Sequence, residues 1–337
     1  MHNRDKITIV MPVYNAGKFL ATTIESIIQQ TYSNFELIVV DDYSKDDSFV
    51  ILQKFAKLDE RIIPAKNNKN KGVIGALQTA ITLSTGDFIT RMDADDLMVE
   101  NKLEVMHRKL KQYGSGYVAT GQVKYFSDSK TLGEGYQNYE NWLNAMTAKG
   151  TNYDRIYTEC PIPSPCWMLH RHDFEKCGGF SPNTYPEDYD LAFRMLASGL
   201  TIIPEQKILH LWRDHPERAS RNDSNYADNS FVPLKVKYFL QLHHELPLAV
   251  WGAGRKGKQI VQELLKQGVQ PTWYCNNSRK IGKEIYGIKM QSEQALITSK
   301  NSVQVVVAVS SPEEKRAIHK QLLAIGWEEN RDFFFFV

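Results

Sequence analysis

The sequence predicts an α/β fold, with a mostly parallel sheet flanked by helices and a smaller α/β domain after it. Short apolar runs of strand length alternate with segments whose apolar residues recur at helical spacing, which is typical of a parallel sheet. Acidic residues follow several of these runs, and the carboxyl ends of parallel strands form the crevice where such sheets bind ligands. At 337 residues the chain is long enough for two domains, and the alternation restarts near residue 246.

The first two predicted strands enclose a helix. A buried strand begins at Ile7 and passes into a loop at Pro12–Asn15, helical spacing predicts a helix over Ala16–Gln30, and Phe35–Val40 forms the second strand. Strand, helix and strand in this order make a right-handed unit with parallel strands. The acids of Asp41–Asp42 therefore lie at the carboxyl end of a strand.

The following elements lead to a second, denser acidic cluster. A helix over Asp47–Leu58, a short strand and a helix over Ile74–Leu83 come first. A buried strand over Asp87–Thr90 then ends in the hexapeptide Arg91–Asp96, whose three acids in four positions repel one another. Hard carboxylate oxygens of this kind suit Mg²⁺ or Mn²⁺. The alternative is a solvated turn in which an acid caps a helix expected to start near Met98.

The first half of the chain lacks the usual phosphate-binding devices. No G-x-G-x-x-G follows the first strand, and no GxxxxGK[ST] is present. A nucleotide diphosphate bound here needs another positive charge, which a metal held by Asp93 and Asp95 would supply.

Composition limits the other classes of protein. A formal net charge of +2 argues neither for nor against nucleic acid, so any anionic partner must be bound by local charges. We expect no nucleic-acid partner. No apolar run approaches the ~18 residues of a membrane span, and the N-terminus lacks the apolar core of a signal peptide. The four cysteines show no metal-site spacing, so we expect reduced, buried thiols in a cytoplasmic protein. These cysteines are Cys160, Cys166, Cys177 and Cys275.

Four ordered motifs and a later acidic pair resemble those of family 2 glycosyltransferases. The motifs are Val10–Asn15, Val40–Ser44, Asn70–Gly72 and Arg91–Asp96, and the pair is Glu187–Asp188, preceded by Gly178–Phe180. The resemblance covers roughly residues 6–225 and implies the GT-A fold, a nucleotide-diphosphate sugar donor and inversion at the transferred sugar. One position departs from the family, because Tyr43 stands where a glycine is usual.

The resemblance implies a donor site at these motifs. The first loop and Asp42 would hold the base and ribose, and a carboxylate such as Asp42 is suited to accept the imide N–H of uracil, which favours a UDP-sugar. Arg91 would lie near the diphosphate or pair with neighbouring acids, and Arg213 would meet the phosphates. The donor-binding residues are Pro12, Val13, Tyr14, Asn15, Asp42, Gly72, Arg91, Asp93 and Arg213.

The resemblance also implies a metal site and a catalytic base. Asp95 would ligate Mn²⁺ or Mg²⁺ directly, and Asp93 would contact the ribose or a metal-bound water. His215 is a further ligand or a hydrogen-bonded structural residue. Asp188 is the candidate general base for the acceptor hydroxyl, with Glu187 and Asp190 as nearby alternatives.

The acceptor is expected to be a hydroxyl of a surface-glycan precursor, of lipopolysaccharide or capsule, and it can be lipid-linked. Pro161–His172 is expected to shape the acceptor side. A linker at 226–245 is expected to contain an amphipathic helix that docks on the first domain. Alternatively, its lysines would contact an anionic membrane. That contact would place the protein peripherally at the inner face of the membrane.

Residues 246–337 resemble the small Rossmann-like domains appended to sugar-processing enzymes. Gly252–Gly257 carries G-x-G-x-x-G between a strand and a helix, but Asn276–Asn277 stands where an acid would bind the ribose of NAD. We expect a structural or oligomerising role, forming a homo-oligomer, ahead of small-molecule binding. The apolar tail Phe333–Val337 would need covering, as a central strand or a subunit contact.

Two other functions compete with the transferase. An NAD-dependent oxidoreductase would use Gly252–Gly257, but it lacks the ribose-binding acid and a catalytic Tyr-Lys or His pairing. A non-catalytic sugar-nucleotide-binding protein would keep the fold, but Asp93, Asp95 and Asp188 are all present. The expected organisation is a transferase domain at 1–225, a linker helix at 226–245 and a Rossmann-like domain at 246–337.

Overall fold

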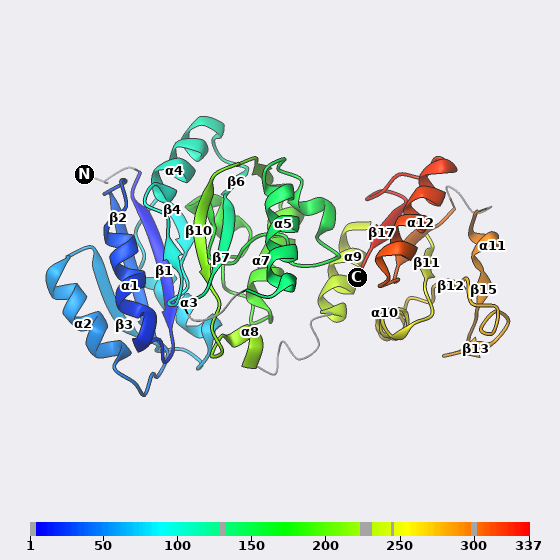
Figure 1. The fold of residues 1–337 in the computed structure, drawn as a ribbon, viewed down its shortest axis with the longest axis horizontal. Coiled ribbons are helices and arrows are strands. Elements are labelled where there is room, and N and C mark those ends of the chain that lie inside the picture. Colours follow the sequence, from blue (N-terminus) through cyan, green and yellow to red (C-terminus); the bar gives the residue numbers. More distant parts are fainter. Residues whose placement is uncertain (1–4, 129–131, 223–230, 244–245, 298–301) are drawn as a thin grey trace. The chain divides into compact units, whose positions relative to one another are not determined.

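The computed structural model describes residues 5–128, 132–222, 231–243, 246–297 and 302–337 (Figure 1). The chain divides into two compact units, each described by itself below. The first is Met1–Tyr153 with Pro161–Asn225, and the second is Asp154–Cys160 with Tyr226–Val337. The domain boundary expected at 225/226 falls in 223–230, outside the described residues.

A seven-stranded sheet forms the centre of the first unit, in the order β3-β2-β1-β4-β8-β6-β9. Its first four strands are parallel, as the βαβ pattern predicts, and β8 runs antiparallel to both β4 and β6. Pairing of Val13 with Asp41 brings the two predicted donor loops to the same edge of the sheet. The bounds are β1 Ile7–Val13, β2 Phe35–Asp41, β3 Ile62–Lys66, β4 Phe88–Arg91, β6 Tyr117–Thr120, β8 Trp167–His170 and β9 Thr201–Ile203.

Helices pack on this sheet through their apolar faces. In α1, Phe19, Leu20, Ile24 and Ile27 recur at helical spacing and are buried, which is the pattern that predicted this helix. The helices of the first unit are α1 Gly17–Ile28, α2 Ser48–Leu58, α3 Val73–Leu83, α4 Lys102–Tyr113, α5 Glu134–Thr147, α6 Arg171–Lys176, α7 Glu187–Ala197 and α8 Ala219–Asn222. The 3₁₀ helix Asn152–Arg155 crosses the chain boundary between the units, which falls after Tyr153.

A second, three-stranded sheet follows the acidic cluster, in the order β5-β10-β7. The helix expected near Met98 is wrong, because Leu97–Met98 forms β5 and pairs with β10 (Ile208–Arg213). α4 begins only at Lys102. Neither Asp95 nor Asp96 caps a helix, so both side chains are available for other contacts. The third strand is β7 (Gln122–Phe126).

The second unit is built on a parallel five-stranded sheet, in the order β15-β12-β11-β16-β17. Its strands are β11 Leu248–Trp251, β12 Thr272–Cys275, β15 Gln291–Ser292, β16 Gln304–Val307 and β17 Phe333–Phe335. Its helices are α9 Val232–His243, α10 Arg255–Lys266, α11 Glu293–Ile297 and α12 Pro312–Ala324, and β13 Glu284–Ile285 pairs with β14 Ile288–Lys289. The amphipathic helix α9 belongs to this unit.

The apolar tail is covered within the second unit. β17 lies at an edge of its sheet, so the expected central strand is wrong. Phe334 and Phe336 are buried, and Phe336 stacks on Tyr157 with ring centroids 5.0 Å apart. Phe239 of α9 approaches Phe334 at 4.9 Å. The tail therefore gives no reason of its own for a subunit contact.

All four cysteines are free, as expected, and three of them are buried while Cys160 is partly exposed. Within the described ranges, none of the helices is both long and apolar enough to cross a membrane.

Candidate functional site

The segments that follow β2 and β3 bring together a buried carboxylate and a glycine. Asp42 accepts hydrogen bonds from Asn67 Nδ2 at 2.6 Å and from the Gly72 amide at 2.8 Å. Gly72 has φ of 125°, a conformation that favours glycine. Since a carboxylate has about four lone-pair sites, these two donors leave Asp42 capacity to accept another hydrogen bond.

Two exposed tyrosines lie in the loops that follow β1 and β2. Tyr14 and Tyr43 are 51% and 53% exposed. Lys71 Nζ lies 4.9 Å from the centroid of the Tyr14 ring, and Asn15 Oδ1 accepts a hydrogen bond from the Lys45 amide at 2.8 Å. Tyr43, which stands where the family pattern has glycine, adopts a left-handed conformation with φ of 60°, at a cost of about 1–2 kcal/mol. Exposed aromatic faces of this kind suit the binding of a planar base.

Pro12 and Val13 support these loops at the end of β1. Val13 is buried, and its carbonyl accepts a hydrogen bond from the Asp42 amide at 2.7 Å. This bond ties the two predicted donor motifs to each other.

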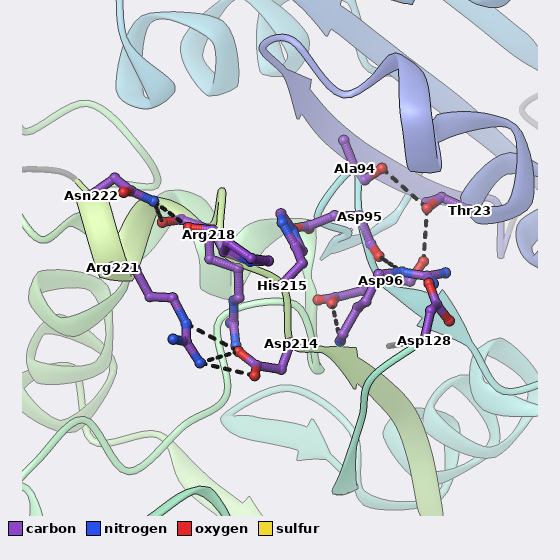
Figure 2. A network of polar contacts seen from close by, with 12 residues as sticks. Thr23, Ala94, Asp95, Asp96, Asp128, Asp214, His215, Arg218, Arg221 and Asn222 are labelled. Carbon is purple, nitrogen blue, oxygen red and sulfur yellow. Dashed lines mark hydrogen bonds and ion pairs between the residues drawn. The ribbon is translucent and has the colours of Figure 1, made fainter. Parts of the chain in front are cut away.

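Two of the three predicted metal ligands meet. Asp95 Oδ2 lies 2.9 Å from His215 Nε2, as Figure 2 shows. Asp93 instead accepts a hydrogen bond from Arg91 Nε at 2.9 Å. In the part of the chain that the structure describes, no three His, Cys, Asp or Glu side chains are grouped closely enough to hold a metal.

The pair nevertheless has the chemistry of a partial metal site. Asp95 and His215, which share a hydrogen bond here, offer a carboxylate oxygen and an imidazole nitrogen, two kinds of atom that bind divalent metals. His215 Nδ1 is buried and has no hydrogen-bond partner among the described residues. Phe19 packs on the His215 ring at 4.4 Å and limits its motion. These residues fit Mn²⁺ or Mg²⁺ that completes its shell with phosphate oxygens and water.

Behind this pair lies a buried polar network that the sequence analysis missed. Asp96 Oδ2 is 2.9 Å from His210 Nε2, and His210 Nδ1 is 3.5 Å from Lys102 Nζ. Burial raises the pKa of the Asp96 carboxyl well above its usual range and lowers the pKa of His210 well below its usual range. The sequence carried one sign that Lys102 is buried: it lies at helical spacing from the apolar residues Met106 and Leu110 and so shares their helix face.

Arg213 binds protein groups. Its Nε donates to the Asp95 carbonyl at 2.7 Å, its amide donates to Asp96 Oδ1 at 2.8 Å, and its guanidinium pairs with Asp128. Only 5% of Arg213 is exposed. Arg213 therefore holds the acidic turn in place, and whether it also meets phosphate stays a prediction.

Two other cations lie on the same segment. Arg218 rests 5.5 Å from the ring centroid of Trp212. Arg221 makes three hydrogen bonds to Asp214, at 2.8, 2.9 and 3.2 Å (Figure 2). Arg218 is thus held over an aromatic face, and Arg221 by a carboxylate.

Arg91 joins the acidic turn to the start of α7. It is buried, and besides Asp93 it binds Glu187, with Nη1 donating to Oε1 at 2.7 Å. Asp190 is also occupied, because its Oδ2 accepts from Arg194 Nε at 2.7 Å. Of the three acids considered as base, Glu187 and Asp190 are therefore paired with arginines. The position of Arg91 near a diphosphate stays a prediction.

Asp188 is the remaining acid of this turn. Its Oδ1 accepts a hydrogen bond from the Tyr189 amide at 2.8 Å. Burial, aided by the negative charges of Glu187 and Asp93 and opposed by Arg91, raises the pKa of Asp188 to about 7. Asp188 also lines a small cavity with Ser164 and Trp167 from the segment expected on the acceptor side. A carboxylate of this kind is suited to accept a proton at neutral pH.

Comparison with known proteins bears on this arrangement. The sequence profile described as Glycosyl transferase family 2 matches residues 8–178. The chain is 34% identical over 128 residues to Glycosyltransferase GlyA of Streptococcus pneumoniae, covering 38% of this chain and 18% of that relative. It is 39% identical over 222 residues to the Escherichia coli UDP-Glc:alpha-D-GlcNAc-diphosphoundecaprenol beta-1,3-glucosyltransferase WfaP, covering 64% of this chain and 80% of WfaP. The chain spans less than half the length of several other matched relatives.

The fold also resembles solved glycosyltransferase structures. Mannosyltransferase PcManGT from Pyrobaculum calidifontis, in complex with GDP-Man and Mn2+, matches with a TM-score of 0.52 and 18% identity, covering 77% of this chain and 69% of that one. At this level of identity the likeness concerns the fold alone, which is the GT-A fold expected from the sequence.

Proposed function

Because the chain belongs to glycosyl transferase family 2, we propose that it is an inverting, metal-assisted glycosyltransferase acting on a surface-glycan precursor. Asp188 carries this proposal. It is a carboxylate whose pKa is raised to about 7, close to the best value for a base at neutral pH, and it begins the helix that Arg91 ties to the acidic turn.

The proposed donor is a UDP-sugar. Asp42 can accept the imide N–H of uracil in addition to its bonds from Asn67 and Gly72. Tyr14, which is exposed, offers a ring face to the base. WfaP, 39% identical over 222 residues, is named for UDP-Glc.

Asp95 and His215 would hold the metal, with Asp93 reaching it through water. When bound, Mn²⁺ or Mg²⁺ would offset the negative charge that grows on the departing diphosphate. Arg213 keeps the Asp95 backbone in place through its 2.7 Å hydrogen bond, and Asp96 fixes the Arg213 amide. The chain thereby orients the Asp95 carboxylate before the donor arrives.

Asp188 would remove the proton from the attacking hydroxyl. The hydroxyl oxygen forms a bond to the anomeric carbon as its proton passes to the Asp188 carboxylate, and the bond from that carbon to the diphosphate breaks, with its electron pair leaving on the diphosphate. Attack from the face opposite the diphosphate inverts the anomeric centre. Because Glu187 is paired with Arg91, Asp188 is better placed than Glu187 to take the proton.

The proposed acceptor is a hydroxyl on a sugar linked through diphosphate to a lipid. The printed name of WfaP describes an acceptor of this class. Such an acceptor would draw the cytoplasmic enzyme to the inner face of the membrane. The proposed organisation keeps the transferase at 1–225 and the linker at 226–245. The unit at 246–337 would have a structural or oligomerising role.

Release of UDP from UDP-sugars, with and without the lipid-linked acceptor, tests the proposal. We expect Asp188→Asn to lower kcat by about 10²–10⁴-fold while UDP affinity is retained. Asp190→Asn is the matched control in the same helical turn, since it removes the negative charge that pairs with Arg194 and should lower thermal stability with little change in kcat. An Asp188→Asn enzyme as fast as the wild type would remove Asp188 from the mechanism.

A further inference from the structure

Ser164 carries a buried hydroxyl that the described chain does not satisfy. The residue is 7% exposed, and Ser164 Oγ has no hydrogen-bond partner among the described residues. Buried polar groups are nearly always hydrogen-bonded, and leaving one unpaired lowers stability. The hydroxyl is therefore a candidate for binding something that enters the site.

The backbone around Ser164 is anchored on both sides. The Pro161 carbonyl accepts a hydrogen bond from Asn152 Nδ2 at 2.8 Å, and the Pro165 carbonyl accepts one from Lys102 Nζ. The Pro163 carbonyl accepts from the Cys166 amide at 2.9 Å. The flanking prolines also fix φ on either side. Ser164 is thus held in place by a rigid loop while its own hydroxyl stays unpaired.

Ser164 and Asp188 line the same small cavity. Its volume of ≈ 10 Å³ is about that of one water-sized group, too small for a sugar ring. The other lining residues are apolar: Ile162, Trp167, Leu191, Ala192 and Met195. A cavity with apolar walls and two polar residues is suited to a single hydroxyl group, which can pair with both.

We propose that this cavity binds the attacking hydroxyl of the acceptor, with Ser164 as a second residue that contacts it. This inference rests on the proposed function. The bound hydroxyl donates its proton to Asp188 and accepts a hydrogen bond from Ser164 Oγ–H on one lone pair. Its other lone pair remains for the anomeric carbon. Ser164 keeps its own proton throughout, so the transfer balances as described for Asp188 alone. A water molecule in the same cavity would give hydrolysis of the donor.

Ser164→Ala and a matched control separate this role from a structural one. Since Ser164 Oγ is unpaired, its removal should leave the melting temperature unchanged or raise it. Transfer from a UDP-sugar to an N-acetylglucosamine-diphosphate-lipid probe should fall about tenfold in kcat/KM for the acceptor, the worth of one hydrogen bond, with donor KM unchanged. Ser26→Ala is the control: Ser26 Oγ accepts from the Met98 amide at 3.0 Å and donates to the Thr23 carbonyl at 2.7 Å. It should lower the melting temperature and leave transfer unchanged.

The outcomes distinguish this inference from the proposed function. If Asp188→Asn loses transfer while Ser164→Ala transfers as fast as the wild type, the role of Ser164 is overturned and the proposed function stands. Slower hydrolysis of the UDP-sugar by Ser164→Ala, with transfer unchanged, means that the cavity holds water only and also overturns it. A lower melting temperature with unchanged transfer assigns Ser164 a structural role. A wild-type protein that neither hydrolyses nor transfers from any UDP-sugar overturns the proposed function itself.

Discussion

Asp188→Asn should stabilise the folded protein at the pH where it disables the enzyme. The substitution keeps the side-chain shape, and the amide oxygen can still accept the hydrogen bond from the Tyr189 amide. What it removes is a carboxylate whose negative charge is unfavourable in the folded state, because burial and the charges of Glu187 and Asp93 disfavour it.

The size of this effect follows from the pKa of Asp188. A rise from 3.8 to about 7 means that ionising Asp188 costs the folded state about 4 kcal/mol, at ~1.4 kcal/mol per pKa unit. Since the folded pKa is raised, the contribution of Asp188 to the unfolding free energy of the wild type is fully present below pH ~4. This contribution of about 4 kcal/mol is lost as the pH rises through ~7. The Asp188→Asn variant has no carboxylate at this position, so its unfolding free energy does not fall through this ionisation. Its unfolding free energy should therefore match the wild type at pH 4 and exceed it by up to about 4 kcal/mol at pH 8.

Urea unfolding of the two proteins at a series of pH values measures this difference. Because the chain has two units, the transition of the first unit should be followed by its own probe, such as UDP binding or proteolysis within residues 1–153. A stability difference that does not change between pH 4 and pH 8 would refute the raised pKa of Asp188 and, with it, the physical basis for its role as base.

Three further predictions concern other residues. Glu36→Gln should destabilise the protein by about 3 kcal/mol at pH 7 in urea unfolding. Burial raises the pKa of Glu36, but hydrogen bonds from Lys6, Thr8 and Thr85 together outweigh it and lower this pKa to about 2. Since the folded pKa is depressed, the difference should shrink as the pH falls from ~4.5 to ~2. His215→Ala should raise the Mn²⁺ concentration needed for UDP binding by at least about tenfold in calorimetric titration, and it should also lower the melting temperature, because the contacts with Asp95 and Phe19 are lost; equal metal dependence would exclude His215 as a ligand. Phe336→Ala should destabilise the second unit by about 3–5 kcal/mol in urea, because its buried ring stacks on Tyr157, while UDP binding should persist.

The sequence was most informative where local periodicity and tertiary structure agree. The helix with Phe19, Leu20, Ile24 and Ile27 and the buried strands around it were predictable from spacing alone. The family resemblance placed Asp42 and Gly72 in one donor site, and in the structure the Gly72 amide donates a hydrogen bond to Asp42. The pairing of Asp95 with His215 was expected only from the family resemblance.

Features that depend on distant segments were not predictable in the same way. Leu97–Met98 is too short to show a period, and it becomes a strand only because β10 pairs with it. Lys102 and His210 are types of residue usually expected near solvent, and only the fold brings them together in the interior. Ser164 gave no signal of its own, because an unpaired hydroxyl is visible only once every neighbouring group has been placed.

The most direct test of the account is calorimetric titration of the wild type and Asp95→Asn with UDP, each with and without Mn²⁺. The account predicts that Mn²⁺ tightens UDP binding to the wild type by at least about tenfold, about 1.4 kcal/mol, and that Asp95→Asn abolishes this gain. UDP binding that is equally tight without Mn²⁺, or unaffected by Asp95→Asn, would contradict a metal-assisted donor site at the acidic turn.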